Sequence, residues 1–208
     1  QNAASIAGLI LTTDCMIAEK PKSAQQVAGA AAFFIWRVAQ NALKRMRVAQ
    51  FDIDPGPQYF AFSSEFLVFL IQIADRIAYQ RLGASERVAF TTALATRLGE
   101  ILEGNQTDLL GPAGDRSYGS QFISLFNECS PDYAEFRYDD SGPDFAFLRY
   151  LGHRLEEIML EKDHSWVVSQ VMDIEAPEAV TMVQKSMADL FETGPRPART
   201  RRVRVSGD

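Results

Sequence analysis

Apolar residues recur along most of this chain at the three- and four-residue spacing that is typical of amphipathic helices. The first such stretch follows Pro21, and within it Ser23 and Gln26 form the capping-box pattern of a helix start. We therefore expect a helix from Ser23 to about Gln50. Residues 1–22 stay unassigned, because the apolar run inside them fits a short strand as well as a frayed helix.

The next stretch combines a loop signal with the most apolar segment of the chain. Residues 51–62 contain Asp-Pro-Gly-Pro and several aromatic residues, which predicts a loop packed against the core. Ser63 or Ser64 is then the expected cap of a second helix, and Gly83 its end. Residues 66–71 are apolar on every side of that helix, so it should lie at the centre of the fold.

A third helix is predicted from Ser85 and Glu86 to Gly104 and Asn105, where glycine and asparagine favour a helix end. The connection after the second helix is only a few residues long, so these two helices should form an antiparallel hairpin. Residues 106–114 then have the glycine-rich, polar composition of a loop.

Residues 118–129 predict another amphipathic helix, since their apolar positions follow the helical period. Pro131 should stop or kink that helix, because proline lacks the amide hydrogen that continues the hydrogen bonding. Tyr133 and Phe136 then belong to a separate short helical turn, and residues 139–143 form a tight turn.

Two more helices complete the pattern. Pro143 suits the first position of one helix, which should run to about Glu161, with Gly152 allowing the close approach of a neighbouring element. Pro177 opens the last helix, which ends near Gly194. The sequence leaves open whether helix continues between Glu161 and Pro177.

The predicted fold class is all-α, a single domain of about six principal helices around the near-central second helix. We assign residues 23–194 to this domain and residues 195–208 to a flexible, basic C-terminal tail. The 208 residues include 47% hydrophobic residues and 14 phenylalanines, which supply enough large side chains for one extended core.

Charge divides the chain into an acidic body and a basic tail. Residues 1–194 hold 16 Lys and Arg against 26 Asp and Glu, a net charge of −10, whereas the tail has a net charge of +4. An acidic body disfavours nucleic-acid binding, so we expect the tail to contact this body or a second copy, with an external polyanion as the alternative. The basic residues of the tail are Arg196, Arg199, Arg201, Arg202 and Arg204.

The uncharged stretches of the sequence are short. Residues 23–36 and 66–74, two uncharged and largely apolar stretches, fall well below the roughly 20 apolar residues that a membrane-spanning helix needs, so no membrane span is expected. Cys15 and Cys129 lie far apart without metal-type spacing. They fit free thiols in the reducing cytoplasm, with a single disulfide as the alternative.

An aromatic group with neighbouring acidic residues is the main candidate for a ligand or partner patch. Its residues span a turn and two predicted helix ends, where they could line a pocket or form an exposed docking surface. The competing interpretation is that they form a satellite part of the core. The candidate patch consists of Tyr133, Phe136, Tyr138, Asp140, Phe145 and Tyr150.

The two histidines are weak candidates for metal ligands. His153, Glu157 and His164 would share one face of a continuous helix, and Glu161 precedes His164 with the E-x-x-H spacing of carboxylate-bridged metal bundles. That motif requires a second copy, and the sequence has no further histidine to supply it. We therefore expect a solvated helix face, and no metal or other cofactor.

Recognisable catalytic constellations are missing from the sequence, which favours a non-enzymatic helical interaction or adaptor domain whose partner is a protein or a second copy. The first alternative is a small-molecule-binding domain or enzyme with a pocket near residues 133–150. The second alternative is polyanion binding through residues 195–208, which would weaken steeply as salt rises.

Overall fold

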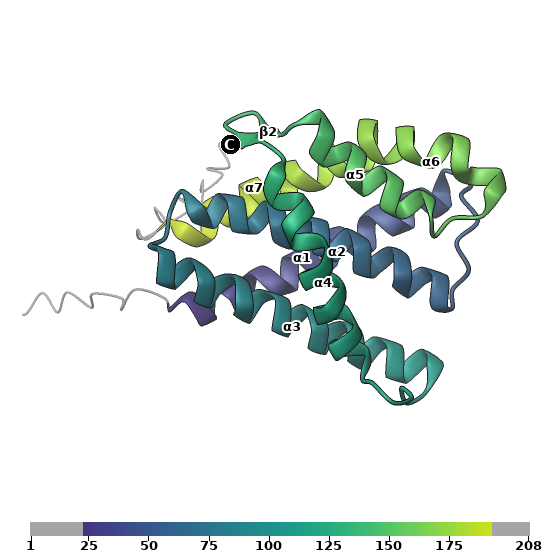
Figure 1. Ribbon diagram of the computed structural model, residues 1–208, viewed down its shortest axis with the longest axis horizontal. Helices are drawn as coiled ribbons and strands as arrows, with labels where there is room; N and C mark the ends of the chain where they lie inside the picture. The colour runs from purple at the N-terminus through teal and green to yellow at the C-terminus, as the bar shows by residue number, and fades with distance from the viewer. Residues whose placement is uncertain (1–22, 193–208) are drawn as a thin grey trace, which may run out of the picture.

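Helices dominate the computed structural model, which describes residues 23–192 (Figure 1). Six of the helices in this part of the chain are 12 residues or longer, which confirms the prediction of an all-α domain. They are α1 (Ala24–Val48), α2 (Pro57–Tyr79), α3 (Ala84–Leu110), α4 (Tyr118–Glu135), α5 (Phe145–Glu156) and α7 (Ala176–Phe191).

Short elements connect the later helices. Between α4 and α5, β1 (Tyr138–Asp139) and β2 (Gly142–Pro143) form an antiparallel hairpin in which Tyr138 lies opposite Pro143. After α5, the 3₁₀ turn η1 (Glu161–Asp163), the helix α6 (His164–Gln170) and the π-helical turn η2 (Val171–Glu175) lead directly into α7. The segment that the sequence left open is therefore helical but interrupted.

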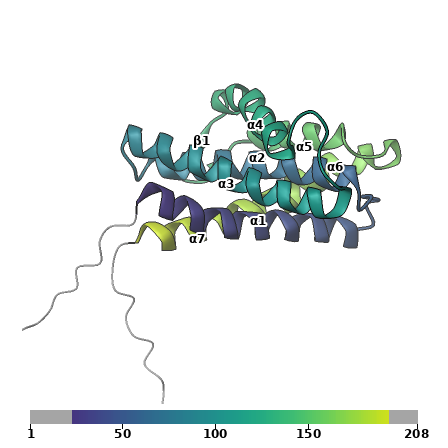
Figure 2. The ribbon, with the colours of Figure 1, turned by 90° about the horizontal axis from the view of Figure 1, so that it is seen from below.

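The helices form three layers, which are seen edge-on in Figure 2. One outer layer consists of α1 and α7, which contact each other, and the middle layer consists of the α2–α3 hairpin. The third layer holds α4, which crosses α2 and α3, together with α5 and α6 (Figures 1 and 2). The predicted hairpin of the second and third helices is confirmed.

Helix α2 is the centre of this arrangement, as its all-round apolar pattern predicts. Every residue from Phe66 to Ala74 is buried, and α2 contacts α1, α3, α4, α5 and α7. The rings of Phe62, Phe66 and Phe69 follow one another along the helix at centroid distances of 5.9 Å. Burial of such side chains is the dominant favourable contribution to folding.

Two local predictions are confirmed in detail. The Ser23 hydroxyl accepts from the Gln26 amide at 3.2 Å while the Gln26 side chain accepts from the Ser23 amide at 2.9 Å, which is the capping box. Gly152 lets α5 approach α6, because a Cβ atom there would lie 3.0 Å from a methyl group of Val168.

The predicted loop at residues 51–62 is wrong in its second half, since α2 begins at Pro57. Proline is favoured in the first turn of a helix, where its missing amide hydrogen costs no hydrogen bond. The aromatic side chains Phe60 and Phe62 are buried from within that helix. The predicted end of the second helix at Gly83 is wrong as well. Helix α2 ends at Tyr79, and Gly83 is the residue before α3.

The predicted end of the third helix at Gly104 and Asn105 is also wrong, since α3 continues to Leu110. A glycine inside a helix costs only about 1 kcal/mol relative to alanine, which the rest of a long helix can offset. The Asn105 side chain donates to the Ile101 carbonyl, so it bonds within the helix. The chain turns at Gly111 instead, where φ is +86° and glycine is favoured.

Pro131 lies inside α4, so the separate turn predicted for Tyr133 and Phe136 is wrong. Proline removes one helical hydrogen bond, but the turn that follows is fixed by tertiary contacts. Tyr133 is fully buried, and the Arg76 guanidinium donates to the carbonyl oxygens of Tyr133, Ala134 and Phe136 at 3.0 to 3.3 Å.

The helix predicted from Pro143 to Glu161 is shorter at both ends. Pro143 belongs to β2, and Asp144 is the N-cap of α5, because its carboxylate accepts from the Phe147 amide at 2.9 Å. At the other end, α5 stops at Glu156, and a turn separates it from η1.

Two predictions concern residues outside the described part of the chain, namely the unassigned segment 1–22 and the tail 195–208. Within residues 23–192, none of the helices is long and apolar enough to cross a membrane. This agrees with the sequence-based expectation for that part of the chain.

The central position of α2 predicts a large effect of shortening its side chains. Leu70→Ala should lower the free energy of unfolding by about 2–5 kcal/mol, because it removes buried methyl groups and leaves a cavity. Leu109→Ala is the matched control, since that side chain is 60% exposed and its loss should cost less than about 0.5 kcal/mol. Denaturant titration measures both, and equal effects would contradict a central α2.

Candidate functional site

The structure places the aromatic candidate residues in two different environments. Tyr133 is fully buried, and its ring lies 4.9 Å from that of Phe147 and 4.8 Å from that of Tyr150. Phe136 packs on the same cluster, at 5.5 Å from Tyr150. These rings fill the space between α4 and α5 and pack on Phe69 of α2, so they form an extension of the core.

The other members of that candidate patch lie at or near the surface. Tyr138 is half-buried, and its hydroxyl accepts from the Gln184 side chain at 3.1 Å. Asp140 is exposed in the β1–β2 turn, and Phe145, the first residue of α5, is 67% exposed. We call Phe145 together with Asp139 and Asp140 the acidic knob.

The acidic knob has a defined conformation. Asp139 accepts from the Ser141 amide at 2.9 Å and from the Ser141 hydroxyl, and these bonds lower the pKa of the Asp139 carboxyl. Asp144 caps α5 immediately before Phe145. The Asp139 carboxylate therefore stays ionised at neutral pH, and the exposed Phe145 ring follows six residues later in the chain.

A strip of polar residues on α2 holds the third layer in place. Gln72 donates to the Ser130 hydroxyl at 2.8 Å, and Arg76 binds the carbonyl oxygens at the end of α4. Glu65 accepts from Arg154 of α5 in a bidentate pair, with Arg154 Nε 3.1 Å from each carboxylate oxygen. Charged and hydrogen-bonding groups thus fix α4 and α5 on an otherwise apolar helix.

The surroundings of Glu65 keep the neighbouring groups protonated. Burial raises the pKa of the Glu65 carboxyl, although Arg154 opposes that effect. The bond to Glu65 raises the pKa of Arg154, and burial raises the pKa of the Cys129 thiol. Burial also raises the pKa of Tyr133 far above its usual value. A protonated, buried thiol is a poor nucleophile, so this cluster serves packing rather than catalysis.

The weak candidates for metal ligands do not come together in one site. His153 Nδ1 lies 3.0 Å from Glu156 Oε2 and His153 Nε2 accepts from Arg149, whereas His164 Nε2 lies 3.0 Å from the Met159 carbonyl oxygen. Because α5 ends before Glu157, no continuous helix face carries His153, Glu157 and His164. Among the described residues, no group of three or more His, Cys, Asp and Glu side chains could hold a metal ion.

A second buried carboxylate joins the π-helical turn to α1. Glu175 is fully buried, and it accepts from Arg45 Nε at 2.8 Å and from Gln170 at 3.2 Å. Arg45 also lies 3.2 Å from Glu178 of α7. The two ion pairs of Arg45 connect α1 with η2 and α7, so they hold the fold together.

An open groove lies where the α2–α3 hairpin turns. Its cavity volume is about 450 Å³, within the range of ligand sites. Tyr79 and Val88, one on each helix, are 68% and 66% exposed. We call this feature the corner groove; it is lined by Asp75, Tyr79, Leu82, Ala84, Arg87, Val88, Thr91 and Thr92.

Charged groups make the wall of the corner groove rigid. Asp75 accepts from Arg87 Nε at 2.9 Å and from the Thr91 hydroxyl at 2.6 Å, and a second Arg87 nitrogen completes a bidentate pair. The Arg87 guanidinium lies 4.9 Å from the centre of the Tyr79 ring, a cation–π distance. The pair with Asp75 raises the pKa of Arg87, so its charge is permanent.

No motif in the sequence indicates the corner groove. Asp75 and Arg87 are 12 residues apart on two helices, and each alone looks like an ordinary polar position at a helix surface. Tyr79 and Val88 look like continuations of apolar stripes. The short connection between α2 and α3 was the one available signal, because it brings the end of the second helix beside the start of the third.

The buried Glu65–Arg154 pair predicts pH-dependent stability. Arg154→Met should cost about 3–5 kcal/mol near neutral pH, since it leaves a buried carboxylate without its partner. Removing the cation raises the pKa of Glu65 further above its ordinary value of 4.5. The variant is then most stable below pH 4.5. Its free energy of unfolding falls as pH rises from there through the raised pKa of Glu65 in the folded state.

Denaturant titration between pH 4 and pH 8 measures this effect. Adding Glu65→Gln to the Arg154→Met variant should abolish the extra pH dependence, because the titrating group is gone. Arg149→Met is the control, an exposed arginine on the same helix. A cost of Arg154→Met that did not change with pH would show that packing alone is lost.

The separated histidines predict no stabilisation by metals. Zinc, iron or manganese in modest excess should leave the melting temperature unchanged, because a ligand raises it only by binding the folded state. Differential scanning calorimetry with and without a chelator measures this. A rise that disappears in His153→Ala would contradict the expectation of a solvated face.

The corner groove and the acidic knob are both surface features in which an exposed apolar group adjoins charged groups held in a fixed geometry. The buried pairs of Glu65 and Glu175 are contacts within the fold. Comparison of the whole chain with protein-family models, with curated proteins and with solved structures finds no match, so these local geometries are what bears on function.

Proposed function

We propose that this chain is a non-enzymatic helical interaction domain that binds an apolar side chain of a protein partner in the corner groove. The observation that carries the proposal is the pair of exposed side chains Tyr79 and Val88 beside the ordered guanidinium of Arg87. Tyrosine and arginine are enriched at the energetic centres of protein interfaces. Because Asp75, which also accepts from the Thr91 hydroxyl, already holds Arg87, little side-chain entropy is lost on binding.

The chemistry of the groove supports binding over catalysis. Asp75 is engaged by Arg87 and Thr91, so its carboxylate has no role as a general base without breaking those bonds. The Glu86 carboxylate accepts from the Gly83 amide at the start of α3. Asp75, Glu86 and Arg87 are therefore committed to the fold.

Binding of a small molecule is the second candidate function, favoured by the 450 Å³ volume of the groove. The open shape and the exposed walls favour a side chain that enters from a larger partner. The groove replaces the region of residues 133–150 as the place where either ligand would bind, because the rings there pack on one another.

We also propose a cytoplasmic setting for the domain. Cys129 is fully buried as a free thiol, and reduced thiols are typical of reducing compartments. Cys15, the other cysteine, lies outside the described residues. A thiol count on the unreduced, denatured protein tests this proposal, and a disulfide would contradict it.

A titration with a model side chain tests the groove itself. N-acetylphenylalaninamide should shift the amide resonances of residues lining the groove, with a Kd on the order of 1 mM for a ligand of this size. Val88→Glu should weaken binding about tenfold, a loss of roughly 1.4 kcal/mol, because it places a charge on the apolar wall. Two-dimensional NMR measures both.

The matched control is Leu109→Glu, which introduces the same charge at an exposed position of α3. It should leave the titration unchanged. N-acetylalaninamide should cause no shifts, since its methyl group buries too little apolar surface. Shifts spread over the whole molecule, or equal for all variants, would contradict a docking site in the corner groove.

A further inference from the structure

The molecule carries on its own surface a group that complements the corner groove. We infer that the occupant of the groove is Phe145 of a second copy of this chain, so that copies join head to tail. This inference deepens the proposed function and rests on it, since it names the partner of the same groove.

Phe145 has the properties of an interface anchor. Its side chain is 67% exposed, although phenylalanine is usually buried, and it stands at the first position of α5. The Asp144 cap and the β1–β2 hairpin fix the backbone on its N-terminal side. An aromatic ring on a rigid backbone loses little entropy when it binds, which favours its use as an anchor.

The apolar side chains of the groove are of the types that pack well against an aromatic ring. Tyr79, Leu82 and Val88 offer a ring and aliphatic groups to an entering phenyl ring, and aromatic pairs prefer such offset or edge contacts. The cavity of about 450 Å³ has room for one phenylalanine side chain.

The charges around the two features are opposite. The groove segment, residues 75–88, has three arginines against two acidic residues, although the described body as a whole is strongly acidic. The knob segment, residues 138–145, has three aspartates and no basic residue. Arg87 is paired with Asp75, whereas Arg81 is exposed at the hairpin turn, so Arg81 is the cation that can approach the aspartates of a second copy's knob.

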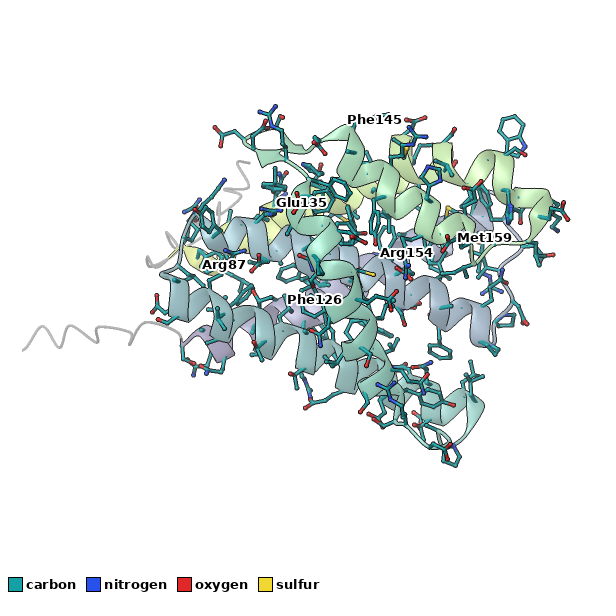
Figure 3. All side chains as sticks on the ribbon, in the orientation of Figure 1. Arg87, Phe126, Glu135, Phe145, Arg154 and Met159 are labelled. Atoms are coloured by element: carbon teal, nitrogen blue, oxygen red, sulfur yellow. The ribbon has the colours of Figure 1, made fainter. Side chains whose placement is uncertain are left out.

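The two features lie on different parts of one molecule. Figure 3 labels Arg87 at the groove and Phe145 at the start of α5, with Glu135 of α4 between them. Both sit on packed helices, so a molecule cannot place its own Phe145 in its own groove. Each copy therefore donates one knob and accepts another, which is a heterologous contact that forms a closed ring or an open chain.

The strength of this contact is limited by repulsion. Residues 1–194 have a net charge of −10, so two bodies repel each other at long range, and one anchor supplies a small interface. Association is therefore weak and concentration-dependent. It is detectable at protein concentrations on the order of 100 µM.

Sedimentation velocity on the full chain over a concentration series tests the inference. The wild-type chain should form species that grow beyond a dimer as concentration rises. Phe145→Ala should remove the knob, and the double variant Tyr79→Ala with Val88→Glu should remove the groove. Each variant alone should be monomeric, with association weakened at least tenfold.

Mixing the two variants is the decisive step. The Phe145→Ala chain keeps its groove and the groove variant keeps its knob, so an equimolar mixture should form dimers that do not grow further. A symmetric interface, in which both copies use the same patch, would give no such rescue. Trp166→Ala is the control, a 70% exposed aromatic on α6 that should leave association unchanged.

Several results would overturn the inference. These are a wild-type chain that stays monomeric up to about 1 mM, association that survives Phe145→Ala, and a mixture of the variants that stays monomeric. Circular dichroism and thermal melts confirm that each variant is folded before it is scored. If N-acetylphenylalaninamide still binds the groove, the groove remains a docking site with a different partner, and if it does not, the proposed function fails as well.

Discussion

The burial of α2 on all sides is the constraint on which the rest of this structure depends. A helix without a solvent-facing side must pair its charged groups inside the protein, because an unpaired buried charge is costly. Glu65 and Arg76 meet this requirement in different ways, the first with Arg154 of α5 and the second with the carbonyl oxygens that end α4. The positions of α4 and α5 are thus set by the needs of α2, and the aromatic cluster around Tyr133 fills the space between them.

The same helix leads from the core to the corner groove. Its last turn leaves the crowded centre, so Tyr79 is exposed while Ala78 beside it is buried. The pair of Asp75 with Arg87 ties this turn to the start of α3, and Thr91 adds a hydrogen bond from one turn further along. A groove built on two packed helices keeps its shape before a partner arrives, which is the property that a docking surface needs.

Local structure explains why Phe145 stays outside the core while its neighbours enter it. The Asp144 cap starts α5 with Phe145 on the outer side, and Phe147 two residues later points inward to the rings of Tyr133 and Phe69. The β1–β2 turn places Asp139 and Asp140 close by in sequence. The molecule thus carries two surface features that differ in charge. The acidic knob has an exposed ring and aspartates, whereas the corner groove has arginines at its edge.

The sequence by itself determined the all-α class, the capped start of α1, the central place of α2 and the α2–α3 hairpin. Each of these follows from a local signal or from the period of apolar residues, which is the same in any context. Helix ends were predicted less well, because Gly104 and Pro131 carry local penalties of a few kcal/mol at most. The rest of a long helix offsets the first penalty, and the contacts of Arg76 with the end of α4 offset the second.

Only the tertiary structure decided which candidate residues share a site. It separated Tyr133, which is buried, from Phe145 and Asp140, which are exposed, and it ended α5 before Glu157 could align with His153 and His164. It also brought Asp75 and Tyr79 beside Arg87 and Val88, residues that no motif connects. The physical reason is that a helical period shows which face of a helix is apolar, whereas burial, exposure and charge pairing depend on which other helix covers that face.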